Sequence, residues 1–293
     1  MALVAPVVAI LVAASSGPAA EPSNSRDLIH IGIVGTLFRD VPETLVMALM
    51  EPFAVLMEAQ TGLRGELCPA GQAYDLARKL AEDKLQIGVF QGIEYAWAQQ
   101  RYADLQPLMV IITKYAHQHA FLVIRASDRA NGFAGLKGKI LAMPKFNHEH
   151  CYQFVEKHCR QLGAEPERFF SKIAKPKSAE DALDEVADGK VAGAVIETVP
   201  LECYKRRKPG RFAELSVAAA SEVFPASVVV CHRGALPDEV IRRFREGMLN
   251  GQNTAIGRQL LMLWRVGGFE TIPADYQTIC RNIVKDYPPP AAK

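Results

Sequence analysis

Apolar residues follow two alternating spacings along the chain: short runs that mark strands, and longer stretches of helical period. Strands are predicted at residues 31–34, 65–68, 86–90, 108–112, 120–124, 139–143, 171–174, 192–196 and 227–231. Helices are predicted at residues 43–60, 73–83, 93–101, 149–162, 179–187, 199–206, 238–249, 256–266 and 276–284. Because strands alternate with helices, the pattern predicts an α/β fold with mostly parallel sheets flanked by helices.

Local residues refine two of these helices and one turn. Pro52 lies inside the helix predicted at 43–60 and is expected to kink or split it, because proline lacks the backbone N–H. Gly163 follows the helix at 149–162 and is suited to end it. The basic run Lys205-Arg206-Arg207-Lys208 precedes Pro209 and is predicted to form a solvated turn.

The length of 293 residues suits two lobes, yet no low-complexity linker divides them. Two short β-branched runs, Ala120–Arg125 going out and Ser227–His232 coming back, are therefore predicted as crossover strands. This assigns 28–119 and 232–285 to a discontinuous first lobe and 120–231 to a second lobe. Residues 286–293 are predicted to be a tail.

Residues 1–20 have the pattern of a secretory signal peptide. Ala2 to Ala14 is almost wholly apolar, no charged side chain precedes Glu21, and small residues follow the apolar core. The run is shorter than the roughly 20 residues of a membrane-spanning helix. Cleavage is expected near Ser15 or Ala20, with export to the periplasm. The alternatives are an apolar tail or a misassigned start codon.

Composition narrows the classes of function. The 34 basic and 32 acidic residues give a net charge of +2, which offers no basic face for nucleic acid. Six cysteines permit disulfides in an exported protein, but their spacing matches no zinc ribbon and leaves the pairing open. Cys159 and Cys231 have apolar neighbours and are expected to be buried thiols.

Four stretches, taken in order, resemble one family. They are residues 74–89 with Tyr95, Leu136-Lys137-Gly138-Lys139, residues 182–195, and residues 225–230 with 236–237, 267–269 and Tyr276. Over residues 28 to 285 the chain resembles phosphate/phosphonate-type periplasmic solute-binding proteins of ABC transporters. The resemblance implies the type II binding-protein fold, a small ligand between two lobes, and an ABC permease in the membrane as partner. It also implies a monomer without cofactor or covalent chemistry.

The resemblance also points to residues of the cleft, where the carboxyl ends of strands from both lobes face each other. It places Thr36 and Phe38 there after the first strand, Gln91 and Tyr95 after the third, and Glu197 after the strand at 192–196. The alternatives are turn or cap roles for Thr36 and Gln91, a core position for Tyr95 and a solvated helix start for Glu197.

The helix that begins near Asn147 corresponds to the anion site of the family. Free backbone N–H groups and the helix dipole favour an anion there, and Asn147 is a suitable N-cap residue. Glu149 in the first turn opposes a bound anion by charge repulsion. His148 and His150 donate to an oxyanion when protonated.

A second pair of histidines, His117 and His119, precedes the outgoing crossover. If these two lie at the cleft edge, they approach His148, His150, Glu149 or Cys151. Three or four such ligands would suit zinc, copper or nickel, and the four histidines are the candidate set. The alternative is four surface histidines. The ligand is therefore left open between an oxyanion and a metal ion or metal chelate.

Enzymatic motifs are absent from the sequence. It contains no G-x-S-x-G, H-E-x-x-H, P-loop or Rossmann fingerprint, so a binding protein and not an enzyme is predicted. The rival hypothesis is a ligand-sensing or signalling protein on the same fold that no longer serves transport.

Overall fold

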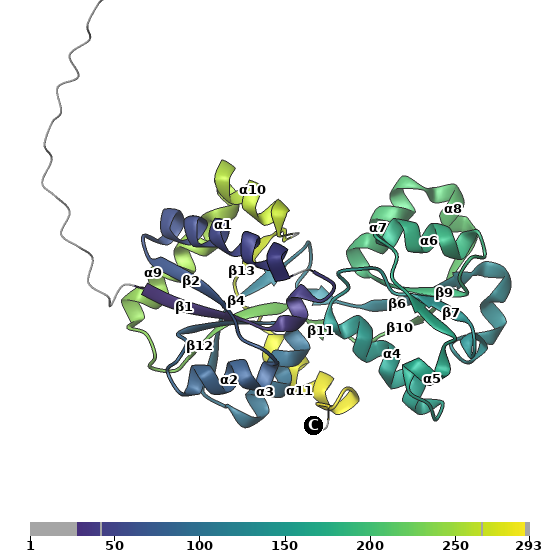
Figure 1. Cartoon of the computed structure of the whole chain (residues 1–293), viewed down its shortest axis with the longest axis horizontal. Coiled ribbons are helices and arrows are strands. Elements are labelled where there is room, and N and C mark those ends of the chain that lie inside the picture. Colours follow the sequence, from purple (N-terminus) through teal and green to yellow (C-terminus); the bar gives the residue numbers. More distant parts are fainter. Residues whose placement is uncertain (1–27, 42, 265, 291–293) are drawn as a thin grey trace, which may run out of the picture.

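The computed structural model describes residues 28–290 except 42 and 265, so the predicted signal peptide and its cleavage positions lie outside the described residues. Two α/β lobes lie side by side along the long axis of the molecule (Figure 1). Among the helices described, none is long and apolar enough to cross a bilayer. The six cysteines all lie in the described part and are free thiols.

The first lobe is built on a six-stranded sheet in the order β13-β4-β12-β3-β1-β2. Its strands are β1 (Leu28–Ile33), β2 (Arg64–Pro69), β3 (Ile87–Phe90), β4 (Leu105–Ile112), β12 (Ser227–His232) and β13 (Gly268–Glu270). Strand β1 pairs parallel with β2 and β3, while β12 pairs antiparallel with β3 and β4. Four of the six strands thus share one direction, as the sequence predicts.

Helices cover both faces of this sheet (Figure 1). One face packs against α2 (Ala73–Ala81), α3 (Gly92–Arg101) and α11 (Tyr276–Asp286). The other packs against α1 (Glu43–Thr61), α9 (Asp238–Asn250) and α10 (Ala255–Leu263), with short 3-10 helices η2 (Gly35–Phe38) and η5 (Gly251–Asn253) at its margin. Alternation along β12 explains the two layers, because Val228 and Val230 face the first group while Val229 faces the second.

The second lobe has a five-stranded sheet in the order β10-β6-β9-β7-β8. Its strands are β6 (Ala120–Arg125), β7 (Ile140–Ala142), β8 (Lys172–Ala174), β9 (Gly193–Glu197) and β10 (Leu215–Ala220). Four strands again share a direction, with β6 opposed to its neighbours β9 and β10. The helical elements are η3 (Ala126–Asn131), η4 (Ala134–Leu136), α4 (Glu149–Gln161), α5 (Pro166–Phe169), α6 (Ala179–Ala187), α7 (Thr198–Arg207) and α8 (Pro209–Ala213).

The crossover segments differ from the prediction. Ser227–His232 is an interior strand of the first-lobe sheet and Ala120–Arg125 belongs to the second-lobe sheet, so neither run is the crossover itself. The chain passes between the lobes through β5 (His117–Gln118) and β11 (Phe224–Pro225), which pair antiparallel. Each is only two residues long, too short to leave a periodic signal in the sequence.

Two local expectations also need correction. Helix α1 is continuous from Glu43 to Thr61 with Pro52 inside it, so of the two alternatives for Pro52, a kink or a split, the split is excluded. Residues 205–207 form the last turn of α7 instead of a solvated turn. Strand β10 was missed because its alanine-rich sequence lacks an alternating pattern of large apolar residues.

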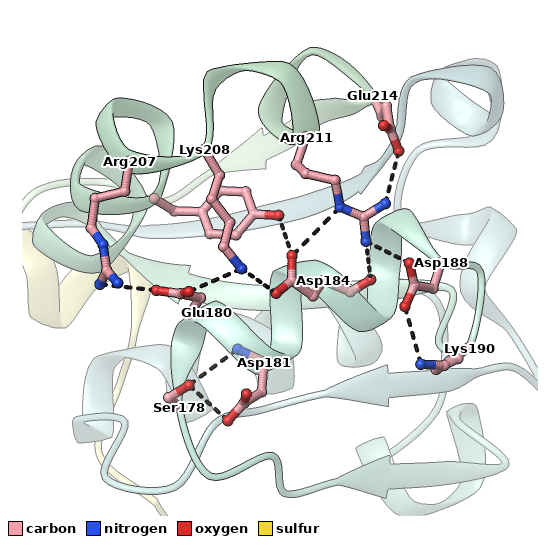
Figure 2. Close-up of polar contacts among 11 residues, drawn as sticks. Ser178, Glu180, Asp181, Asp184, Asp188, Lys190, Arg207, Lys208, Arg211 and Glu214 are labelled. Atoms are coloured by element: carbon pink, nitrogen blue, oxygen red, sulfur yellow. Dashed lines mark hydrogen bonds and ion pairs between the residues drawn. The ribbon is translucent and has the colours of Figure 1, made fainter.

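Charged side chains tie α6 to α7 and α8 around Asp184 (Figure 2). Lys208 Nζ lies 2.6 Å from Asp184 Oδ2, and the Tyr204 hydroxyl donates to Oδ1 at 2.7 Å. Burial opposes ionisation of Asp184, but the bonds from Lys208 and Tyr204 outweigh it and lower its pKa. Lys208 also pairs with Glu180 at 2.9 Å, and Arg211 pairs with Asp188 at 2.5 Å.

Asp184→Asn is expected to lower the unfolding free energy by about 1 kcal/mol, because it removes a charge that several groups share but that solvent still reaches. The loss should be full above the pKa of the unfolded carboxyl and fade as the pH falls through the lower pKa of the folded state, below which both states hold a neutral side chain. Urea unfolding at pH 7 and pH 3 measures it. Glu185→Gln, on the same helix but outside this cluster, is the control; an equal loss there would contradict the assignment.

Candidate ligand-binding cleft

A cavity of about 920 Å³ opens between the lobes. The second lobe contributes the loop from Pro144 to His148, the start of α6 and the start of α7, including Glu197 and Thr198. The crossover contributes His117 and Gln118, and the first lobe contributes side chains from its sheet, α1, α9 and α10. Its size is that of a site for an organic molecule.

Helix α4 begins at the cleft, but its start differs from the prediction. The N-cap residue is His148 and not Asn147. The Asn147 side chain is buried and its Nδ2 donates to the carbonyl of Val195 on β9, 3.0 Å away. Asn147 therefore fixes the loop to the sheet and leaves the first backbone N–H groups of α4 free for other partners.

Glu197 supplies one of those partners. It ends β9, and its Oε1 accepts from the backbone N–H of His148 at 2.8 Å and lies 2.9 Å from His148 Nδ1. Burial opposes the charge of Glu197, but His148 outweighs it and holds the pKa of Glu197 to about 2. Burial likewise opposes protonation of His148, but the Glu197 carboxylate raises its pKa. Both shifts favour the ionic form of the pair.

Gln91 supplies the second partner from the other lobe. Its Oε1 accepts from the backbone N–H of Glu149 at 2.5 Å. The Glu149 carboxylate in turn pairs with Arg39 of the first lobe and accepts from Gln153 Nε2 at 2.9 Å. The start of α4 is thus occupied by groups of the protein itself, and one of them, Glu197, stands where an exogenous anion would bind.

Further contacts cross the cleft beside Arg39. Its guanidinium lies 4.2 Å from the ring centroid of Tyr152, and Lys175 pairs with Asp40 at 3.2 Å. With the Arg39–Glu149 ion pair, these contacts form a latch between the turn after β1 and the second lobe. Arg39 was missed in the sequence, where its position next to Phe38 was the available signal.

Thr36 faces a buried carboxyl, not the cavity. Its hydroxyl donates to Glu94 Oε2 at 2.6 Å. Glu94 is only 3% exposed, and burial raises its pKa to about 8 despite the bond from Thr36. Glu94 therefore holds a proton at neutral pH.

Phe38 and Tyr95, both expected at the cleft, lie in different parts of the first lobe. Phe38 lines the cavity, whereas Tyr95 is fully buried in the core and receives a hydrogen bond from Gln277 at 3.2 Å. The expectation that Tyr95 faces the cleft is wrong, because its turn of α3 points into the layer shared with α11.

The histidines separate into two groups. Ligand atoms of His148, His150 and Glu197 lie within 4.8 Å of one another. His150 is 3% exposed, burial lowers its pKa to about 4, and its Nε2 has no hydrogen-bond partner among the described residues. The three residues form a compact set of two imidazoles and a carboxylate.

His117 and His119 do not join this set, so the predicted four-histidine site is wrong. His117 Nε2 pairs with Asp275 at 3.1 Å, and His119 Nδ1 lies 3.1 Å from the carbonyl of Ser221. His117 lies within β5 of the crossover and His119 directly after it, and neither ring joins the set, although the His119 backbone hydrogen-bonds to His150.

A family model described as the periplasmic substrate-binding protein of phosphonate ABC transporters matches residues 39–276. The chain belongs to this family. Phosphonate-type binding proteins are periplasmic, bind small molecules, work with an ABC permease and are not enzymes, as the sequence predicts. No curated protein matches this sequence.

Solved structures share the fold of this phosphonate-type binding protein. XAC2383 from Xanthomonas citri bound to ATP has 13% identity and a TM-score of 0.60, covering 89% of this chain and 97% of its own. PhnD1 from Prochlorococcus marinus, in complex with methylphosphonate, has 13% identity and a TM-score of 0.58, covering 89% of this chain and 97% of its own. A binding-protein component of an ABC phosphonate transporter from Pseudomonas aeruginosa has 18% identity and a TM-score of 0.55, covering 87% of this chain and 85% of its own.

Proposed function

We propose that this chain captures a small ligand between its lobes and delivers it to an ABC permease. The supporting observation is the cavity of about 920 Å³ to which both lobes and the crossover contribute walls. A ligand that touches both lobes favours the closed arrangement over the open one, because the ligand can contact both lobes at once only when they are closed.

The first candidate for the ligand's polar part is an oxyanion, such as a phosphonate. The family match supports it, as does His148 at the cavity wall, where the Glu197 carboxylate raises its pKa against burial. The carboxylate of Glu197 weakens it, since an incoming anion competes with Glu197 for the start of α4.

The second candidate is a transition-metal ion or its chelate. His148, His150 and Glu197 favour it, because two imidazoles and a carboxylate suit zinc, copper or nickel. The unpartnered Nε2 of His150 favours it further, since a buried ring nitrogen normally has a partner.

Thermal unfolding of the untagged mature chain tests both candidates against phosphate, phosphite, methylphosphonate, zinc, copper and nickel. A ligand at one hundred times its Kd stabilises the folded state by about 2.7 kcal/mol, which raises the Tm by a few degrees. No shift with any of the six would contradict the proposal for these ligands and favour the sensing hypothesis.

His150→Gln is expected to abolish a metal-induced rise in Tm, because it removes one ligand of the set. His117→Gln, an exposed histidine outside the set, is the matched control and should keep the full rise. If His150→Gln retains the rise, the metal candidate is wrong. A deletion strain that still takes up the bound ligand would point to sensing and not to transport.

A further inference from the structure

The cavity continues from the cleft into the first lobe, where its walls become apolar. The floor is the sheet face that carries Ile33, Val89 and Ile111, and the roof is formed by α1 and the end of α10. We call this part of the cavity the apolar chamber. The cleft end, by contrast, is lined by charged groups such as Glu197 and Arg207.

An apolar chamber of this kind is unusual inside a lobe. Protein cores are packed to crystal-like density, and voids larger than a water molecule are few. Apolar cavities that do persist stay free of water and accept apolar molecules. A methyl group on a phosphonate would leave most of such a space without contacts, so the chamber suits a larger apolar group.

Two polar atoms are left without partners along this path. Trp264, the residue after α10, packs at 6.2 Å from the Phe38 ring and 5.6 Å from the Phe53 ring. Its Nε1 is buried and has no acceptor among the described residues, although buried indole N–H groups normally have one. The Thr198 hydroxyl, at the cleft end, is likewise buried and unpartnered within the described part of the chain.

We propose that the ligand is amphipathic. Its polar head lies in the cleft near His148 and Thr198, and an apolar group of several carbons enters the chamber between the first-lobe sheet and α1. This group passes the ring of Trp264, whose buried Nε1 has no partner among the described residues. This inference rests on ligand binding in the cleft and specifies its substrate class.

Trp264 is also the probe for the test. The chain has two tryptophans, and Trp97→Phe leaves Trp264 as the single emitter. In this variant, methyl-, butyl- and octylphosphonate are titrated alongside butyrate and octanoate. Transfer of methylenes out of water predicts that affinity rises about three- to fourfold for each methylene, with either head, until the chamber is full. The emission wavelength of Trp264 should shift when the alkyl group of the ligand enters the apolar chamber.

A matched pair of variants locates the effect. Leu45 and Val55 both lie on α1 and are half-exposed, but only Leu45 is in the cavity wall. Leu45→Phe should cut octylphosphonate affinity at least tenfold and leave methylphosphonate affinity unchanged. Val55→Phe should change neither.

The outcomes separate this inference from the proposed function. Equal affinity for methyl- and octylphosphonate, or equal behaviour of the two variants, would overturn the amphipathic ligand and leave cleft binding standing. If affinity rises with alkyl length for the carboxylates but not for the phosphonates, the apolar chamber is supported and a phosphonate as the polar head is contradicted. If no compound of either series binds, the amphipathic ligand and the oxyanion candidate both fail, and only the metal candidate for cleft binding remains.

Discussion

Glu197→Gln is expected to increase the affinity of the cleft for phosphate and methylphosphonate by on the order of tenfold. The wild-type carboxylate accepts the backbone N–H of His148 and so occupies the start of α4 with a negative charge. A neutral amide keeps the shape and removes the charge, so the helix dipole and the backbone N–H groups at the start of α4 act on an exogenous anion without repulsion from a carboxylate. The same variant should lose metal binding, because a carboxylate ligand is gone.

The variant should also be less stable by about 2 kcal/mol at pH 7. Removing one partner of a buried ion pair is costly, but the Glu197 side chain is 17% exposed, so solvent reduces the loss. The pKa of Glu197 is lowered to about 2, so its contribution is present above the ordinary carboxyl pKa and is lost as the pH falls toward 2.

Isothermal titration and urea unfolding measure these two effects. Asp181→Asn is the control, since it removes the same charge from the cavity wall without touching α4. If Asp181→Asn strengthens methylphosphonate binding as much as Glu197→Gln does, the total charge of the cavity wall, and not the start of α4, determines the affinity for the anion.

Glu94→Gln is expected to stabilise the protein at alkaline pH. Burial raises the pKa of Glu94 from 4.5 to about 8, so the folded state binds a proton that the unfolded state releases. The stability of the wild type should therefore fall as the pH rises from about 4.5 to about 8, by on the order of 4 kcal/mol. A glutamine stays neutral and removes this loss while keeping an acceptor for Thr36.

Urea unfolding from pH 4 to pH 9 should show the Glu94→Gln and wild-type curves meeting near pH 4 and diverging as the pH rises from about 4.5 to about 8. Glu58→Gln, at an exposed position of α1, is the control and should run parallel to the wild type. Parallel curves for Glu94→Gln as well would mean that Glu94 is ionised in the folded state.

Apolar spacing along the chain located the large elements well. Helix α6 has the predicted bounds, and β12 was predicted to within one residue, because both bury a regular face. The spacing failed where elements are too short to have a period, as in β5 and β11, and the lobe assignment of β12 was wrong for that reason.

Part of the candidate site could likewise be predicted from the sequence, and part of it could not. His148, His150 and Glu197 meet because Glu197 ends β9 and the two histidines lie at the start of the helix after β7, and the rule that such strand ends share one edge is readable in the sequence. The sequence does not reveal that Glu197 and Gln91 fill the start of α4, since this depends on how β9 and the other lobe are placed. Trp264 was overlooked because it lies in a turn without a motif.

The latch between Arg39 and Glu149 joins the lobes through the protein's own charges. Part of the free energy of closing is therefore independent of cargo. A permease that responded to closure alone would also be engaged by empty protein, and ATP would be hydrolysed without import. Productive coupling with this chain thus requires the permease to detect the contents of the cleft, or the latch to yield when the two proteins meet.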